Sequence, residues 1–127
     1  MSKAFSLISK NENILYLSKD KITRLYIEEY VKKERIYNLE TVKKNIISII
    51  VLDQISDLEN IYLDKIIFTN KLTVYIKKTS ILATSFLTIK YFQDELGYVK
   101  SLGNDEYQKY RIIYFKRNKS KILYLSN

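Results

Sequence analysis

The sequence predicts a single α+β domain, with helices in its first half and a helix–turn–helix followed by two strands in its second half. Apolar residues recur at helical spacing in several places between residues 22 and 66. Both glycines, Gly97 and Gly103, fall within seven residues of each other, which marks turns late in the chain. A length of 127 residues with 46% hydrophobic and 28% charged residues is typical of one globular domain.

The chain opens with a predicted hairpin, followed by a helix. Residues 5–9 and 14–18 are apolar segments on either side of a polar turn at 10–13. Ser18 can cap the helix that follows, and its apolar stripe consists of Ile22, Leu25, Tyr26 and Tyr30. We interpret residues 1–67 as a helical scaffold that also provides a dimerisation surface.

Two further helices complete this predicted scaffold. The first begins after Asn38 and has an apolar stripe formed by Val42, Ile46, Ile49 and Ile50. The second begins at the capping box Ser56-Asp-Leu-Glu59, in which serine and glutamate each accept from the other's backbone amide. Its predicted buried face consists of Leu58, Ile61, Tyr62 and Ile66.

The second half shows a specific order of signals. Asn70 can cap a short helix with Leu72, Tyr75 and Ile76 on its inner face, and a break follows near residues 79–81. A helix is predicted over 84–96 and ends at Gly97. A helix end of this kind needs a residue in the left-handed backbone conformation, which glycine adopts at little cost. A strand at 98–101, a turn at 103–106 and a returning strand at 110–115 follow.

This order of elements resembles a known family. The stretch from Val74 to Phe115, and particularly Phe92-Gln-Asp-Glu-Leu-Gly-Tyr-Val99, is similar to winged helix-turn-helix DNA-binding proteins, including bacterial, plasmid and phage regulators and partition adaptors. The resemblance covers about a third of the chain. It implies a winged helix-turn-helix at 70–116, followed at 117–127 by a basic tail and a last strand.

The resemblance also implies which residues would contact DNA. A recognition helix would present short hydroxyl side chains, one lysine and one aromatic ring to the major groove, namely Thr84, Ser85, Thr88, Lys90 and Tyr91. Contacts to the phosphate backbone from the first helix, the wing and the tail would come from Lys77, Lys78, Lys100, Lys109, Arg111, Lys116 and Arg117.

An alternative interpretation of the second half is a β-rich meander packed on helices. Leu87, Ile89 and Tyr91 alternate with polar residues, which is the period of a strand. The β-branched and aromatic content of the segment favours strands as well. The strands would then be 71–77, 86–92, 97–101, 109–116 and 121–125.

The net charge lies entirely in the second half of the chain. Residues 1–64 hold ten Lys and Arg against ten Asp and Glu, whereas residues 65–127 hold twelve against four, so that all of the formal charge of +8 lies there. A surface with no charged partner usually mixes its signs, and a one-sided positive field concentrates polyanions around it. The asymmetry therefore predicts a nucleic-acid partner.

The composition also argues against several classes of protein. The chain contains neither cysteine nor histidine, which removes disulfides, thiol chemistry, the Ser-His and Cys-His nucleophile pairs and the commonest zinc ligands. We therefore expect no catalytic activity, no metal and no cofactor. The start of the chain lacks a secretory signal and no apolar run approaches the length of a bilayer span, so we expect a cytoplasmic protein without membrane contact.

Three functions remain open from the sequence. The first is a homodimeric protein that binds double-stranded DNA at a specific sequence and acts as a transcriptional regulator or as a plasmid or phage partition adaptor. The second is a module for RNA or single strands that stacks bases on aromatic rings, for which the candidates are Tyr91, Phe92, Tyr98, Tyr110 and Tyr114. The third is a non-catalytic viral or structural protein whose basic face contacts an acidic partner.

Overall fold

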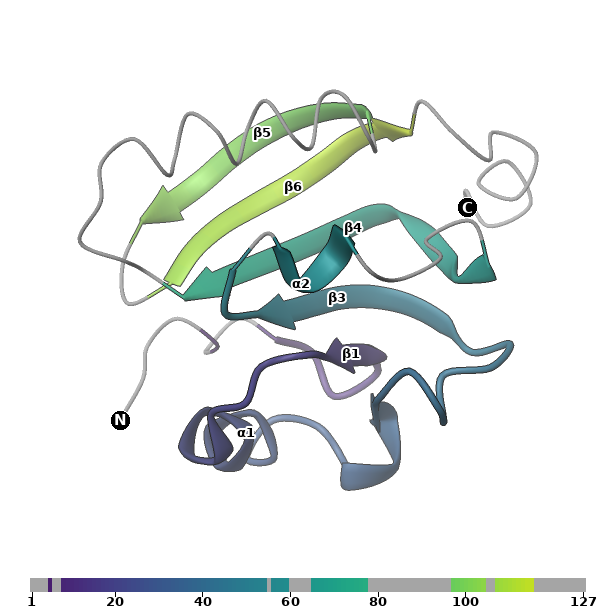
Figure 1. The fold of residues 1–127 in the computed structure, drawn as a ribbon, viewed down its shortest axis with the longest axis vertical. Helices are drawn as coiled ribbons and strands as arrows, with labels where there is room; N and C mark the ends of the chain where they lie inside the picture. The colour runs from purple at the N-terminus through teal and green to yellow at the C-terminus, as the bar shows by residue number, and fades with distance from the viewer. Residues whose placement is uncertain are drawn as a thin grey trace.

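The protein folds around one mixed sheet of six strands. A computed structural model describes residues 5, 8–54, 56–59, 65–77, 97–104 and 107–115. The strands are β1 (Ile14–Tyr16), β2 (Ile36–Tyr37), β3 (Ile46–Leu52), β4 (Ile67–Lys77), β5 (Gly97–Asn104) and β6 (Tyr107–Phe115). Their order in the sheet is β2-β1-β3-β4-β6-β5, and Figure 1 shows them stacked between α1 at one end and β5 at the other.

The helical scaffold predicted for the first half is wrong. The segment that was expected to form the helix after Asn38 contains β3, which pairs in parallel with β1 on one side and β4 on the other. Five of the seven residues of β3 are buried, because both faces of this central strand are covered. A strand of this kind is a continuous apolar run, and its β-branched residues fit a strand better than a helix. Such a run also satisfies a helical period, which is why spacing alone led to the wrong element.

The short helix predicted after Asn70 is also a strand. Residues 67–77 form β4, whose residues from Leu72 to Ile76 are all buried. β4 pairs in parallel with β3 and antiparallel with β6. Since the first helix of the expected motif is the centre of a large sheet, the winged helix-turn-helix arrangement is wrong for this chain. The recognition helix predicted over 84–96 lies outside the described residues.

The antiparallel strand pair predicted near the two glycines is present, although its setting differs. β5 and β6 pair over most of their length, from Gly97 opposite Phe115 to Asn104 opposite Gln108. The three meander strands 71–77, 97–101 and 109–116 overlap β4, β5 and β6. The order in the sheet is nevertheless β4-β6-β5, because β6 lies between the other two, so the segment is not a meander. The strands proposed at 86–92 and 121–125 lie outside the described residues.

The described helical elements are short. They are α1 (Lys21–Ile27), the 3₁₀ turn η1 (Lys33–Arg35) and α2 (Ser56–Glu59). α1 confirms the first predicted helix, but the carboxylate of Asp20 caps it by accepting from the amides of Ile22 and Thr23. α2 begins at Ser56, where the capping box places a helix start.

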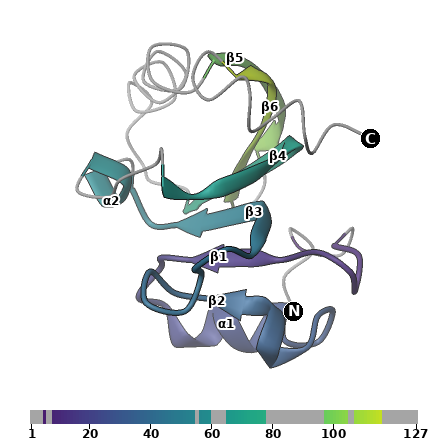
Figure 2. The ribbon, with the colours of Figure 1, turned by 90° about the vertical axis from the view of Figure 1, so that its right-hand side faces the viewer.

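Side chains on the two faces of the sheet form two separate cores. One core contains Leu58 from α2 together with residues of β1, β3, β4 and β6. The other contains Phe5, Ile27 from α1 and the alternate residues of the same strands. α1 and α2 therefore cover opposite faces, and Figure 2 shows α1 beside β1 and β2 and α2 beside β3 and β4. Parallel strands with helices on both faces define an open α/β sheet with two antiparallel strands added at one edge.

The hairpin predicted at 5–18 is wrong as well. β1 lies between β2 and β3 and pairs in parallel with both, so neither of its edges is left for a strand from residues 5–9. The backbone of Asn13 instead contacts β3, where its carbonyl accepts from the amides of Ser48 and Ile49. The register of β3 shifts between Ile47 and Ile49, so these two residues point to opposite cores. This bulge places both apolar side chains in a core and leaves Ser48 to bond to Asn13.

Candidate functional site

Four cationic side chains lie along one face of β4 and β6, and we call them the basic strip: Lys71, Lys77, Lys109 and Arg111. β4 and β6 are antiparallel, with Arg111 opposite Thr73 and Lys109 opposite Tyr75. Residues directly opposite each other share a face of the sheet, and alternate residues of one strand do so too. The register of β4 and β6 therefore brings the four cations to the same face. Lys71 and Lys77 are exposed, and Lys109 and Arg111 are half-buried.

The two cations of β6 are held in place by their neighbours on β4. The Nζ atom of Lys109 lies 5.3 Å from the centroid of the Tyr75 ring, within the range of a cation–π contact. The Nε–H group of Arg111 donates to the hydroxyl of Thr73 at 3.2 Å. Phe5 also packs against Tyr75, with ring centroids 5.0 Å apart. These contacts hold the charged groups of Lys109 and Arg111, both half-buried, over the buried residues Tyr75 and Thr73.

The charges of Lys109 and Arg111 oppose each other. Burial lowers the pKa of Lys109, the charge of Arg111 lowers it further, and Glu12 opposes both effects. Within the described residues, neither Lys109 nor Arg111 makes an ion pair. Two adjacent cations that lack a paired carboxylate gain stability when an anion approaches both. At the end of the strip, Lys77 is 3.5 Å from a carboxylate oxygen of Asp20.

A second polar cluster lies at the carboxyl ends of β1 and β3. The hydroxyl of Ser18 donates to the Asp53 carboxylate at 2.6 Å, and the amide of Lys19 donates to the other oxygen at 2.9 Å. Asp57 in turn accepts from the amides of Asp53 and Gln54. The chain runs from β1 outward to β2 and then to β3 on the opposite side of β1, so this is the point where the strand order reverses. Ligands of open α/β sheets commonly bind at such a point.

A crevice of about 800 Å³ opens beside this cluster and runs along α1. Its walls come from the end of β1, the loop that follows and the outer side of α1; the residues are Tyr16, Ser18, Lys19, Asp20, Lys21, Arg24, Leu25 and Glu28. The hydroxyl of Tyr16 donates to the carbonyl of Asp20, and Arg24 pairs with Glu28. The pKa of Asp20 is lowered, chiefly because its carboxylate accepts from the amide of Thr23. Most polar groups of the crevice are thus bonded within the protein.

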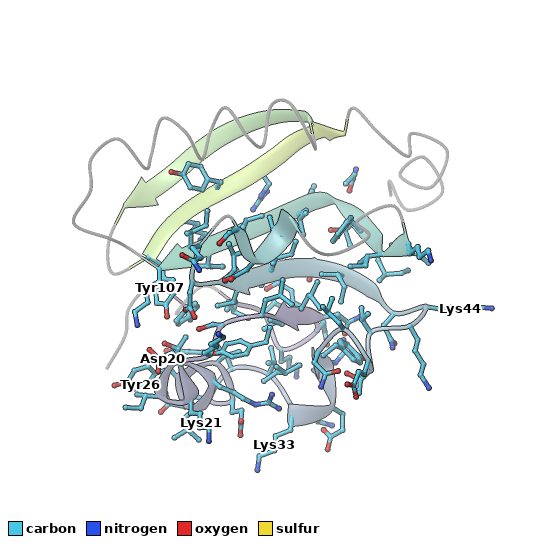
Figure 3. All side chains as sticks on the ribbon, in the orientation of Figure 1. Asp20, Lys21, Tyr26, Lys33, Lys44 and Tyr107 are labelled. Carbon is cyan, nitrogen blue, oxygen red and sulfur yellow. The ribbon has the colours of Figure 1, made fainter. Side chains whose placement is uncertain are left out.

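One hydrogen bond and one ion pair join β6 and β4 to the start of α1. The hydroxyl groups of Thr23 and Tyr107 are 2.6 Å apart and both residues are buried. Burial raises the pKa of Tyr107 to about 12. Figure 3 shows Asp20 at the start of α1 close to Tyr107 at the start of β6. Since Lys77 lies opposite Tyr107 in the sheet, the end of the strip is anchored to α1 by a hydrogen bond and an ion pair.

The structure brings together four of the predicted DNA-contact residues. Lys77, Lys109 and Arg111 belong to the basic strip, and Lys100 on β5 is the register partner of Arg111. The other predicted contacts lie outside the described residues: Lys78, Thr84, Ser85, Thr88, Lys90, Tyr91, Lys116 and Arg117. Sequence reasoning missed Lys71, although its spacing of six residues from Lys77 on one strand would have placed both on the same face. It also missed the Ser18–Asp53 pair, which depends on the parallel pairing of β1 and β3.

Comparison of the chain with protein-family models, with curated proteins and with solved structures gives no match. The protein is described by its own fold and site: a mixed sheet with a basic strip on β4 and β6, near the edge where the strands are antiparallel. In the part of the chain that the structure describes, no helix has the length and apolar character needed to cross a bilayer. The same residues include no group of three or more acidic side chains placed to hold a metal ion.

Proposed function

We propose that the protein binds double-stranded DNA through the phosphate backbone, with the basic strip as the contact surface. The observation that carries this proposal is the pair Lys109 and Arg111, two adjacent cations that share a face and have no ion-paired carboxylate among the described residues. Tyr75 and Thr73 hold the charged groups of these two side chains in place, so little side-chain freedom is lost when an anion binds. The net charge of +8 over residues 65–127 supports the same partner.

Among the side chains of β4 and β6 that the structure describes, the burial of the aromatic rings favours backbone contacts over base stacking. The side chains of the other predicted stacking residues are not among them: Tyr91, Phe92, Tyr98 and Tyr114. Tyr110, one of the rings expected to stack on bases, is only 2% exposed and belongs to the core on the other face of the sheet. Tyr75 and Tyr107, which share the face of the strip, are buried as well. Modules that hold single strands rely on exposed rings. The basic strip offers cations, which neutralise phosphates without selecting a sequence.

The regulatory roles expected from the sequence need an element that contacts base edges. The residues that were expected to form it, between Thr84 and Tyr91, lie outside the described residues. The basic strip supports only one part of the expected function, the binding of the phosphate backbone of DNA.

Fluorescence anisotropy with a labelled random-sequence duplex and the matching single strand tests this proposal. The informative variant is Lys109→Gln with Arg111→Gln, since glutamine keeps part of each stem and can still donate to Thr73. The control is Lys32→Gln with Lys44→Gln, which removes the same charge from exposed positions before β2 and β3. Figure 3 shows Lys44 on the side of the molecule away from Tyr107.

We expect the wild-type protein to bind the duplex, the strip variant to lose at least tenfold in affinity, and the control to lose far less. Equal losses in both variants would show that only net charge matters and would overturn the assignment of the strip. Tighter binding of the single strand than of the duplex would overturn the choice of partner.

A further inference from the structure

The outer face of α1 is apolar and has no partner in the described residues. Ile22 and Leu25 are each 62% exposed, more than any other large hydrophobic residue of the described chain. The buried residues of α1, Thr23 and Ile27, lie on the opposite side of the helix and face the sheet. Two large aliphatic side chains next to each other on a two-turn helix form a small contact surface for another protein.

Charged residues flank Leu25 in a symmetric pattern. Lys21 precedes Leu25 by four residues and Glu29 follows it by four. Past the end of α1 the backbone forms one further turn, in which Glu28 and Val31 donate to the carbonyls four residues before them and Glu29 donates to that of Tyr26. Residues four apart share a helix face, so the three side chains form one line on the exposed side, with Leu25 at the centre.

The two charges at the ends of this line have no partner within the chain. Among the described residues, Arg24 and Lys33 both pair with Glu28, whereas Lys21 and Glu29 are exposed and make no ion pair. Their order does not favour the helix itself, because a helix dipole prefers acidic side chains at its start and basic ones at its end. The line therefore has a basic end and an acidic end that are both available to another molecule.

We propose that two copies of this chain associate through α1, with the helices antiparallel about a two-fold axis at Leu25. Because Leu25 is the midpoint between Lys21 and Glu29, this symmetry places each lysine opposite the glutamate of the other copy. A parallel arrangement would instead bring like charges together. The same patch serves both copies, as a two-fold interface requires. The crevice along α1, with Leu25 on its wall, gives the second copy's Leu25 room to pack.

The size of this contact sets the expected strength. Helices of two turns bury less area than a standard interface, so the dimer forms with an affinity in the weak range and depends on protein concentration. Dimerisation through α1 needs no DNA, so it can be present or absent independently of DNA binding.

Sedimentation velocity over a range of protein concentrations tests the proposal. The single variants Lys21→Glu and Glu29→Lys each turn two attractive pairs into two repulsive ones, and each should weaken dimerisation about tenfold. An equimolar mixture of the two variants restores both attractive pairs, and so does the double variant in one chain. Leu25→Gln should abolish the dimer, whereas Leu39→Gln, at an exposed apolar position outside α1, should leave it unchanged.

Circular dichroism of each variant checks that the fold is intact, which is expected because all of these positions are exposed. A wild-type protein that stays monomeric at the highest concentration reached would overturn the proposal. So would single charge variants that dimerise like the wild type, because that result is expected for parallel helices or for a different surface. A double variant that fails to recover would exclude the antiparallel register.

Discussion

The hydrogen bond between Thr23 and Tyr107 should stabilise the docking of α1 onto the sheet. The two hydroxyl oxygens are 2.6 Å apart, and the side chains are 4% and 6% exposed. Tyr107→Phe removes one hydroxyl and leaves the other buried without its partner. A buried polar group that loses its partner costs about 1–3 kcal/mol. For a domain of this length, each kcal/mol lowers the melting temperature by roughly 3–5 °C.

The assay is a double-mutant cycle with Tyr107→Phe, Thr23→Val and the double variant, measured by urea denaturation. Each single variant should lower the free energy of unfolding by about 1–3 kcal/mol. The double variant should lose less than the sum of the two, because removing both hydroxyls leaves no unpaired group; the coupling should be at least about 0.5 kcal/mol. Losses that add, or a Tyr107→Phe variant as stable as the wild type, would refute the reasoning.

Two further predictions concern pH and the loop after β1. Burial raises the pKa of Tyr107 to about 12, whereas in the unfolded chain it is near 10, so the unfolded state releases its proton first and stability should fall between these pH values. Tyrosinate absorbance followed during alkaline titration and unfolding curves at rising pH check this, and Tyr107→Phe should flatten the dependence. Asp53→Asn should lower the free energy of unfolding by about 1 kcal/mol, because asparagine has a single, uncharged acceptor oxygen and cannot accept from both Ser18 and Lys19. Unchanged urea midpoints for this variant would show that the Ser18–Asp53 bond does not hold the loop.

The sequence predicted those elements whose signals are local. α2 starts at the predicted cap Ser56, whereas α1 is capped by Asp20, two residues after the predicted cap Ser18. The β5–β6 pair was predicted from the turn signals at Gly97 and Gly103, although Gly103 lies within β5 and not in the turn. β3 was assigned as a helix because its apolar residues are nearly continuous, and such a run fits a period of 3.6 as well as a period of 2. β4 was assigned as a helix because Leu72, Tyr75 and Ile76 recur at helical spacing after Asn70. Only their burial on both faces, which depends on distant parts of the chain, makes them strands.

The candidate site was predicted to a similar extent. Lys77, Lys109 and Arg111 were found because charge is visible in the sequence. The contacts that fix them, from Lys109 to Tyr75 and from Arg111 to Thr73, depend on a register between residues more than 30 positions apart. The bond from Ser18 to Asp53 likewise joins two loops that only parallel pairing brings together. Local patterns do not contain this information.

The salt dependence of duplex binding tests the central claim most directly. The logarithm of the binding constant falls linearly with the logarithm of salt concentration, with a slope of about −0.9 for each phosphate that a cation neutralises. If Lys109 and Arg111 each contact one phosphate, the Lys109→Gln, Arg111→Gln variant should have a slope smaller in magnitude by about 2 than the wild type. The Lys32→Gln, Lys44→Gln control should keep the wild-type slope. A strip variant with the wild-type slope would contradict the account, because the two cations would then not contact the DNA.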